Sequence, residues 1–252
     1  NLYVSDEAKD CLVIMNKDGE HIETWGESGS DEGQLNRPSS LAFDLEGNIF
    51  ISDTMNHRIQ KFTRDGKFLQ SIGEHGTGDG QFDMPWGISV DQLGNLYVAD
   101  WRNDRVQKFD QEGNFILSLG SSGSEKGQFK RPTSVTVDNH GDIYVSDAEN
   151  DRVQLFNKDL KYIQSFHGNA TLSPSGQQYI LANAVTLRLR SMADFEKTQR
   201  LNAPMMVKVD DEFRLFILDY GNHRIQIYKK DAVELSKEQI APEMRNPILF
   251  TT

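Results

Sequence analysis

The sequence predicts an all-β fold, a β-propeller built from four-stranded blades. Three observations lead to this prediction: one motif recurs at a fixed interval, apolar and polar residues alternate between turns, and glycine-containing turns separate the alternating segments. Consecutive four-stranded units of about 40–50 residues that carry the same motif are typical of propellers, in which each unit forms one blade around a central channel.

The recurring motif is an apolar segment that ends in an aspartate. Its copies lie at residues 1–6, 48–53, 95–100, 142–147 and 214–219. The first four terminal aspartates are each 47 residues apart, and the last interval is 72 residues, so 25 additional residues are inserted before the fifth copy. The chain is therefore predicted to be a single domain of five units, near residues 1–37, 38–84, 85–131, 132–203 and 204–246.

Each unit is predicted to be an antiparallel meander. In the second unit, strands are expected at residues 39–43, 48–53, 58–62 and 67–72. A turn at 44–47 joins the first two strands, and its glycine supplies the positive φ that a tight reversal requires. A polar link at 54–57 joins the middle strands, and a second glycine turn at 65–66 leads into the last one.

The repeated residues resemble the NHL repeat. The resemblance is carried by Gly80-Gln-Phe-Asp-Met-Pro85, Gly94-Asn-Leu-Tyr-Val-Ala-Asp100 and Asn103-Asp-Arg-Val-Gln-Lys-Phe109, with similar segments at 56–62 and 222–228. It covers nearly the whole chain outside the insertion and implies a propeller. The first unit departs from the pattern, because Lys9 and Cys11 stand where the other units have Asn and Arg.

NHL propellers usually have six blades, whereas five units are visible in this sequence. The chain begins with a second strand, and Pro247 takes the place in order of the prolines that open the other first strands, Pro38, Pro85, Pro132 and Pro204. Residues 247–252 are therefore predicted to supply the missing strand and to close a five-bladed ring, which protects the strand edges. A six-bladed ring trimmed of one unit is the alternative.

Composition excludes several classes of protein. The net charge of −11 disfavours a general nucleic-acid binder, because phosphate is repelled at long range. Cys11 is the single cysteine, so an internal disulfide and a multi-cysteine metal site are excluded. No stretch approaches the roughly 20 apolar residues of a membrane-spanning helix.

Histidine, arginine and aspartate recur at equal places in the units and are predicted to be structural. They include His57, His223, Arg58, Arg105, Arg152, Arg224 and the motif aspartates. A catalytic site needs different residues that converge on one point, whereas repeated residues form separate local networks. We expect each aspartate to accept hydrogen bonds from backbone or guanidinium groups.

The expected inner strands carry no residues suited to catalysis. Residues 39–43, 86–90, 133–137 and 205–209 contain no His, Asp or Glu, which disfavours propellers of the gluconolactonase and amidating-lyase kinds, whose chemistry depends on a central metal. The remaining histidines stand at unrelated positions of the repeat: His21, His75, His140 and His167. We therefore expect no catalytic residue, no cofactor and no metal site.

The units differ most in the two residues that follow the motif aspartate. Trp101, Arg102, Tyr220 and Met55 stand there, and Trp86 enters the same end of the propeller from a connection between blades. Aromatic residues, methionine and arginine are enriched in the cores of protein interfaces, so these residues predict a partner-binding face. The alternative is that Trp86 and the nearby methionines only fill the channel.

The insertion is predicted to form an amphipathic helix near residues 173–199, on the same face. Apolar residues recur there at three- and four-residue steps: Tyr179, Ala182, Val185, Leu189 and Met192. The helix either packs on the propeller or binds a partner. Arg188 and Arg190 belong to a small basic cluster within it and favour an anionic partner.

These features predict a non-enzymatic NHL-repeat propeller that binds a protein or peptide through its insertion-bearing face. The first alternative is an RNA-binding domain, which the resemblance to tripartite-motif NHL proteins implies and the net charge opposes. The second is a metal-dependent lyase or hydrolase, which the lack of channel ligands opposes.

Overall fold

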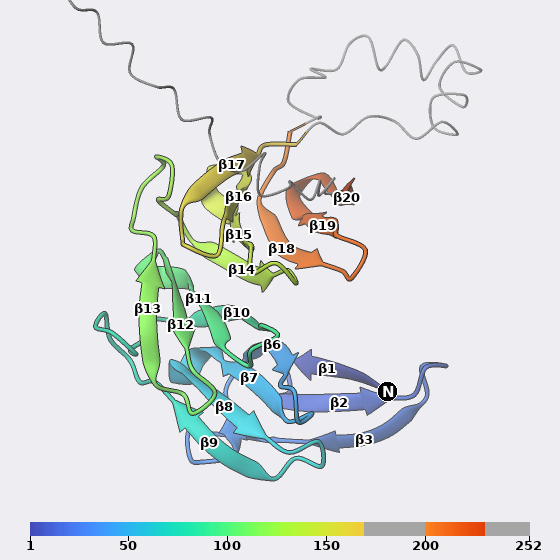
Figure 1. Cartoon of the computed structure of the whole chain (residues 1–252). Coiled ribbons are helices and arrows are strands. Elements are labelled where there is room, and N and C mark those ends of the chain that lie inside the picture. Colours follow the sequence, from blue (N-terminus) through green and yellow to red (C-terminus); the bar gives the residue numbers. More distant parts are fainter. Residues whose placement is uncertain (169–199, 230–252) are drawn as a thin grey trace, which may run out of the picture.

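The computed structural model describes residues 1–168 and 200–229. Within these ranges the chain forms five antiparallel sheets of consecutive strands that follow one another in an arc (Figure 1). Three sheets have four strands, and the first and last show three described strands each. The predicted all-β propeller of five four-stranded meander blades is confirmed.

The strands occur in chain order within each blade. The first blade contains β1 (Leu2–Asp6), β2 (Cys11–Met15) and β3 (His21–Trp25). The second contains β6 (Pro38–Phe43), β7 (Ile49–Asp53), β8 (Arg58–Phe62) and β9 (Phe68–Ile72). The third contains β10 (Pro85–Val90), β11 (Leu96–Asp100), β12 (Arg105–Phe109) and β13 (Phe115–Leu119). The fourth contains β14 (Pro132–Val137), β15 (Ile143–Asp147), β16 (Arg152–Phe156) and β17 (Tyr162–Phe166). The fifth contains β18 (Pro204–Val209), β19 (Arg214–Asp219) and β20 (Arg224–Lys229).

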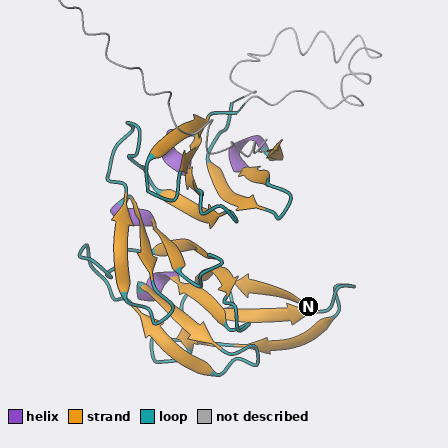
Figure 2. Cartoon of the chain, viewed as in Figure 1, coloured by secondary structure: helices purple, strands orange, loops and turns teal. Residues whose placement is uncertain are grey.

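Short segments connect these strands (Figure 2). Single 3-10 turns follow the motif aspartates of the last four blades: η1 (Thr54–Asn56), η2 (Trp101–Asn103), η3 (Ala148–Asn150) and η4 (Tyr220–Asn222). In the connection between the first two blades, β4 (Glu27–Ser28) and β5 (Gln34–Leu35) pair in parallel. None of the described helices is long and apolar enough to cross a membrane.

The hydrophobic core lies between blades rather than within them. One cluster joins Phe50 and Ile59 of the second blade to Phe82, Leu96 and Phe109 of the third. The other three clusters likewise combine residues of consecutive blades. A single unit cannot bury its apolar faces alone, so stacking against the next unit creates the core.

The innermost strands of consecutive blades lie side by side, and those of the third and fourth blades approach closely at Gly87. Contacts run from β1 to β6, from β6 to β10, from β10 to β14 and from β14 to β18. A Cβ atom added to Gly87 of β10 would lie 2.5 Å from the carbonyl oxygen of Thr133 and 2.6 Å from Cα of Ser134 in β14. Gly87 therefore permits a backbone approach that any larger residue would obstruct.

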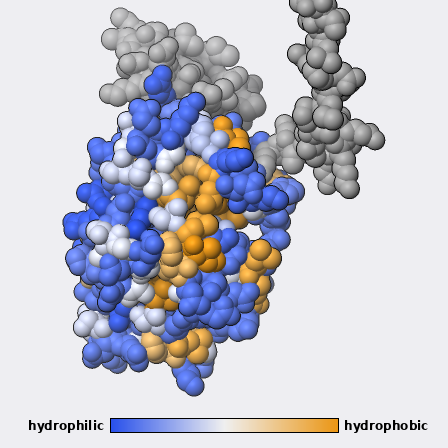
Figure 3. Space-filling view, turned by 60° about the vertical axis from the view of Figure 1, so that its left-hand side comes forward, coloured by the Kyte–Doolittle hydropathy of each residue, from blue (hydrophilic) through white to orange (hydrophobic). Residues whose placement is uncertain are grey.

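Exposed apolar residues recur on the outermost strands. Leu69, Ile116 and Ile163 occupy equivalent places in β9, β13 and β17, with exposed fractions of 44%, 44% and 52%. Figure 3 shows hydrophobic residues in patches between hydrophilic ones on one side of the molecule. Since the outer-strand residues repeat from blade to blade, they belong to the common scaffold.

Two sequence-based predictions fall on other parts of the chain. The insertion helix near 173–199 and the closing strand at 247–252 lie outside the described residues. As expected, the first blade begins with the motif strand β1, which pairs with β2. Leu2 and Val4 of β1 are exposed, so this strand offers apolar positions that an additional inner strand would cover.

Candidate functional site

In the second to fifth blades, the motif aspartate is the acceptor of a hydrogen-bond network. Asp100 is fully buried and accepts hydrogen bonds from Asn103 Nδ2 at 2.9 Å, Arg105 Nε at 2.8 Å, Gln107 Nε2 at 3.1 Å and the backbone N–H of Asp83 at 2.8 Å. Burial raises the pKa of Asp100. The hydrogen bonds from Asn103 and Arg105 lower this pKa, but burial outweighs them. The same network surrounds Asp53, Asp147 and Asp219.

These networks hold the connections between blades. Arg105 Nη2 donates to the carbonyl oxygens of Gly78 and Gln81 at 2.7 and 2.8 Å, and both belong to the segment that leads into the third blade. Arg58 and Arg152 make equivalent pairs of hydrogen bonds. Because the arrangement repeats, it is a structural element, as the sequence predicts, and it does not distinguish one blade from another.

The 3-10 turns and the ends of the blade connections form one side of the propeller, which we call the connection face. The N–H of Met55 in η1 donates to Asn36, and that of Arg102 in η2 donates to Asp83, at 3.1 and 3.0 Å. The corresponding bonds in η3 and η4 have lengths of 3.1 and 2.9 Å. The opposite turn face carries the glycine turns that join the first to the second strand and the third to the fourth.

Four of the predicted partner-binding residues lie together on the connection face. The rings of Trp86 and Trp101 are 5.6 Å apart, and the Arg102 guanidinium is 5.7 Å from a Trp101 ring centroid. Met55 and Trp86 line one small pocket. Arg131 is 4.8 Å from the Trp101 ring on the side of the fourth blade. We call Met55, Trp86, Trp101, Arg102 and Arg131 the tryptophan patch.

The other predicted site residues are not part of this patch. Tyr220 begins η4 and is 61% exposed, but the fourth blade separates it from Trp101 and carries the buried Ala148 at the equivalent place. Arg188 and Arg190 lie outside the described residues. Arg131, which directly precedes the opening proline of the fourth blade, was not among the predicted site residues. Its contact with Trp101 depends on how adjacent blades pack, which the sequence pattern does not show.

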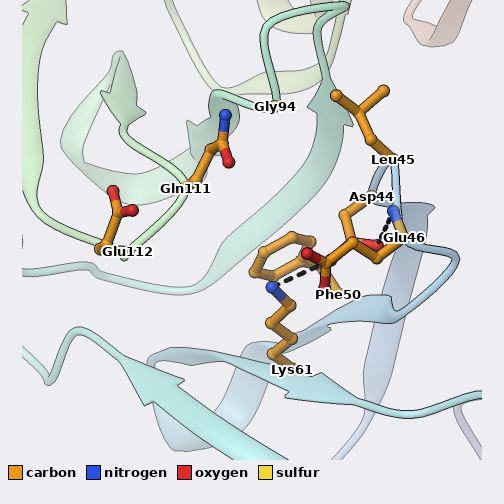
Figure 4. Close-up of a pocket in the computed structure, with 8 residues that line it drawn as sticks. All are labelled: Asp44, Leu45, Glu46, Phe50, Lys61, Gly94, Gln111 and Glu112. Atoms are coloured by element: carbon orange, nitrogen blue, oxygen red, sulfur yellow. Dashed lines mark hydrogen bonds and ion pairs between the residues drawn. The ribbon is translucent and has the colours of Figure 1, made fainter.

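A pocket on the opposite turn face is a competing site (Figure 4). It lies where the turn of Asp44 and Glu46 meets the turn of Glu112 in the next blade, and its volume is ≈ 170 Å³. Lys61 Nζ lies 2.9 Å from Asp44 Oδ2 and 5.0 Å from the Phe50 ring centroid. In the third blade, Lys108 likewise forms an ion pair with Asp91 and lies over the ring of Tyr97. The arrangement therefore belongs to the repeated framework.

The Asp44–Lys61 pair leads to a pH-dependent expectation. Burial by itself raises the pKa of Asp44, but the hydrogen bonds from Lys61 and Asn48 outweigh burial and hold this pKa below its usual range. The folded state therefore favours the ionised carboxylate, and its contribution is complete above the unfolded-state pKa of about 4 and lost as the pH falls through the folded-state value.

We expect Asp44→Asn to lower the free energy of unfolding by about 1 kcal/mol at pH 7, with the difference from the parent chain shrinking as the pH falls below about 4. Urea unfolding between pH 7 and pH 3 measures this difference. Glu46→Gln, at the adjacent exposed carboxylate, serves as the control and should leave the profile unchanged. A constant difference across this range would contradict the expectation.

A second group of chemically capable residues lies at the junction of the second and third blades. His57, His75 and Asp83 each offer a donor atom, and these atoms all lie within 4.8 Å of one another. Burial, followed by the positive charge of His75, lowers the pKa of His57, while the negative charge of Asp83 opposes this shift. From the sequence, His57 is predicted to be structural and His75 stands at an unrelated position of the repeat, so their proximity is visible only in the structure.

The arc of meander blades, with one Asp–Arg network in each of the last four, defines the chain as a repeat β-propeller. A model of the NHL repeat family matches residues 35–62, 82–109 and 129–156. Each match begins in the connection before a blade and ends with that blade's third strand, in the second, third and fourth blades. These blades of the β-propeller are therefore NHL repeats, as the sequence motifs predict. A search of curated proteins found no significant match.

Solved propeller structures share this fold at low sequence identity. A streptogramin B lyase is 12% identical with a TM-score of 0.58, and the match covers 91% of this chain and 65% of the lyase chain. A chain of a nidogen/laminin complex is 18% identical with a TM-score of 0.58, covering 90% and 70%. A gluconolactonase from Xanthomonas campestris is 15% identical with a TM-score of 0.55, covering 85% and 64%. Identities this low show a common fold alone.

Proposed function

We propose that this propeller is a non-enzymatic binding module that presents its connection face to a protein or peptide partner. The observation that carries the proposal is the tryptophan patch, where two half-buried indole rings and two arginines meet at a position that is small in the two neighbouring blades. Thr54 and Ala148 occupy the place of Trp101 in the neighbouring blades and are buried. Trp101 is too large for such burial and stays partly accessible.

The chemistry of the patch favours a partner with aromatic and acidic side chains. Arg102 and Arg131 place positive charge beside Trp101, and Met55 adds a flexible apolar side chain that is 38% exposed. Tryptophan and arginine are the residues most enriched in interface hot spots, and methionine adapts to irregular surfaces. Tyr220 extends the same face at the fifth blade.

The two alternatives receive less support. Stacking of bases on tryptophan beside arginine is a mode of RNA binding, but the net charge of −11 opposes the approach of a polyanion. A channel enzyme that uses a central metal lacks ligands, since β6, β10, β14 and β18 contain no His, Asp or Glu. The lyase and gluconolactonase neighbours contribute only a shared fold.

Selection of peptides from a random library against the immobilised chain tests the proposal. For the selected peptides, Trp101→Ala is expected to weaken binding by about 30-fold or more, because truncation of a hot-spot residue costs roughly 2 kcal/mol. Tyr220→Ala should have a smaller effect in the same direction. Calorimetric titration of each variant measures the change, and thermal unfolding verifies that the variants remain folded.

Glu46→Lys on the opposite turn face is the matched control and should change the affinity less than about twofold, since a distant exposed charge contributes little. The proposal is wrong if Glu46→Lys abolishes peptide binding while Trp101→Ala and Tyr220→Ala bind normally. Sub-micromolar, sequence-selective binding of single-stranded RNA at physiological salt would favour the RNA alternative instead.

A further inference from the structure

One junction between blades carries two histidines where two other junctions carry an aspartate and a serine. In those two junctions, the serine hydroxyl of the connection donates to the carboxylate of the residue that directly precedes β2 or β12. The pairs are Ser28–Asp10 and Ser122–Asp104, each with an oxygen separation of 2.7 Å. At the junction of the second and third blades, His75 and His57 replace both members of the pair, with ring centroids 4.3 Å apart.

The third residue of the cluster also departs from the repeat. Asp83 stands two residues before the opening proline, where the other connections have Asn36, Lys130 and Asn202. Three positions that meet in space thus change together, at one junction, to the residue types that ligate metals. Changes for packing alone would not require two imidazoles and a carboxylate to converge.

The geometry of the cluster suits coordination of a single ion. Metal–ligand bonds of about 2.0–2.1 Å at tetrahedral angles place two ligand atoms about 3.3–3.4 Å apart. Asp83 Oδ1 lies 3.4 Å from His57 Nδ1 and 3.9 Å from His75 Nε2. The first separation equals the edge of a coordination tetrahedron and the second is slightly longer, so small side-chain rotations would complete the site.

A buried oxygen atom points to a missing positive partner. Asp83 Oδ1 is buried and has no hydrogen-bond partner among the described residues. Leaving a buried carboxylate oxygen unsatisfied costs free energy, and a cation held between it and two neutral imidazoles would remove that cost. The His75 side chain is 67% exposed, so an ion can reach the cluster from solvent.

We propose that His57, His75 and Asp83 form a binding site for a divalent transition metal ion of the zinc type. Two imidazoles and one carboxylate favour Zn²⁺, Co²⁺ or Ni²⁺ over Mg²⁺ and Ca²⁺, which prefer oxygen ligands. Three protein ligands leave a fourth position for water or a partner's side chain. The ion would connect the end of η1 in the second blade to the segment that enters the third.

His57 Nδ1 currently accepts a hydrogen bond from the N–H of Met84 at 3.1 Å. Coordination through this nitrogen exchanges that hydrogen bond for a metal bond, because one lone pair serves one of them. The exchange makes the site weaker than a closed structural zinc site, and we expect micromolar affinity.

The test uses the full chain, stripped of metal with a chelator and titrated with ZnCl₂ by calorimetry and with CoCl₂ by visible absorbance. One equivalent of Zn²⁺ should bind, and Co²⁺ should give the absorption bands of a low-symmetry site. The double variant His57→Asp/His75→Ser restores the aspartate–serine pair of the two other junctions and should fold normally. It should lose more than about 100-fold in affinity, because removal of an outer-shell partner alone costs roughly 10–100-fold.

His223→Asp is the control, since His223 follows η4 as His57 follows η1 but belongs to the fifth blade, and it should leave binding unchanged. Zn²⁺ should also raise the unfolding temperature of the parent chain and not that of the double variant. The proposal is overturned if Zn²⁺ does not bind saturably, if the double variant binds equally well, or if Mg²⁺ binds as tightly as Zn²⁺.

Discussion

Asp100→Ala is expected to lower the free energy of unfolding by about 3–5 kcal/mol. The substitution leaves the Arg105 guanidinium without its carboxylate and removes the acceptor of Asn103, Gln107 and the Asp83 N–H in a fully buried place. An uncompensated buried charge accounts for most of the loss. Urea unfolding followed by tryptophan fluorescence measures it.

The first blade provides a matched control for this prediction. Asp6 ends the same motif, but its side chain is 27% exposed, and it accepts hydrogen bonds from the N–H groups of Ala8 and Lys9 at 3.1 Å. Cys11 stands in place of the arginine, so Asp6→Ala should cost less than about 1 kcal/mol. Equal losses for both variants would show that burial of the Asp–Arg pair does not determine its contribution.

Gly87→Ala is expected to destabilise the chain by about 3 kcal/mol or more. The new methyl group would lie 2.5 Å from the Thr133 carbonyl oxygen, a contact with the backbone of β14 that no side-chain rotation can relieve. The third and fourth blades would have to separate, and their shared core, which includes Val135 and Ala99, would loosen. Thermal unfolding and hydrogen exchange of β10 and β14 amides measure the effect.

Gly78→Ala tests whether the loss reflects the close backbone approach. A Cβ at Gly78 would meet the Gln81 side-chain oxygen at 3.0 Å, and this flexible group can move away. We therefore expect a change below about 1 kcal/mol. If Gly87→Ala were equally mild, the innermost strands would be more tolerant of displacement than their separation indicates.

Most of the architecture was predictable because it repeats. The 47-residue interval, the proline that opens each inner strand and the glycine turns are local features, and each strand pairs with the next in sequence. Repetition also identified the Asp–Arg networks as structural, since residues such as Asp100 and Arg105 lie five positions apart and meet across one hairpin. Such contacts depend on register within a blade, which the sequence pattern specifies.

The candidate sites were predictable only in part. Trp86, Trp101, Arg102 and Met55 were recognised because each departs from its repeat, and departures of size and charge are visible in a sequence. Arg131 was missed because its contact with Trp101 crosses to the next blade. The distance between equivalent residues of adjacent blades depends on blade twist and packing, which no local pattern encodes.

The sequence by itself determined the number of visible units, their strand order, the family and the scaffold role of the repeated aspartates, because these depend on periodicity and on contacts within a unit. Tertiary structure alone decided that His57, His75 and Asp83 converge, and that Asp83 Oδ1 is buried with no hydrogen-bond partner in the described part of the chain. His57 follows the 3-10 turn of the second blade, and His75 and Asp83 lie near the two ends of the connection to the third blade. A parallel bridge between His75 and Phe82 folds this connection back on itself. Packing of successive blades, rather than any local preference, brings them to one point.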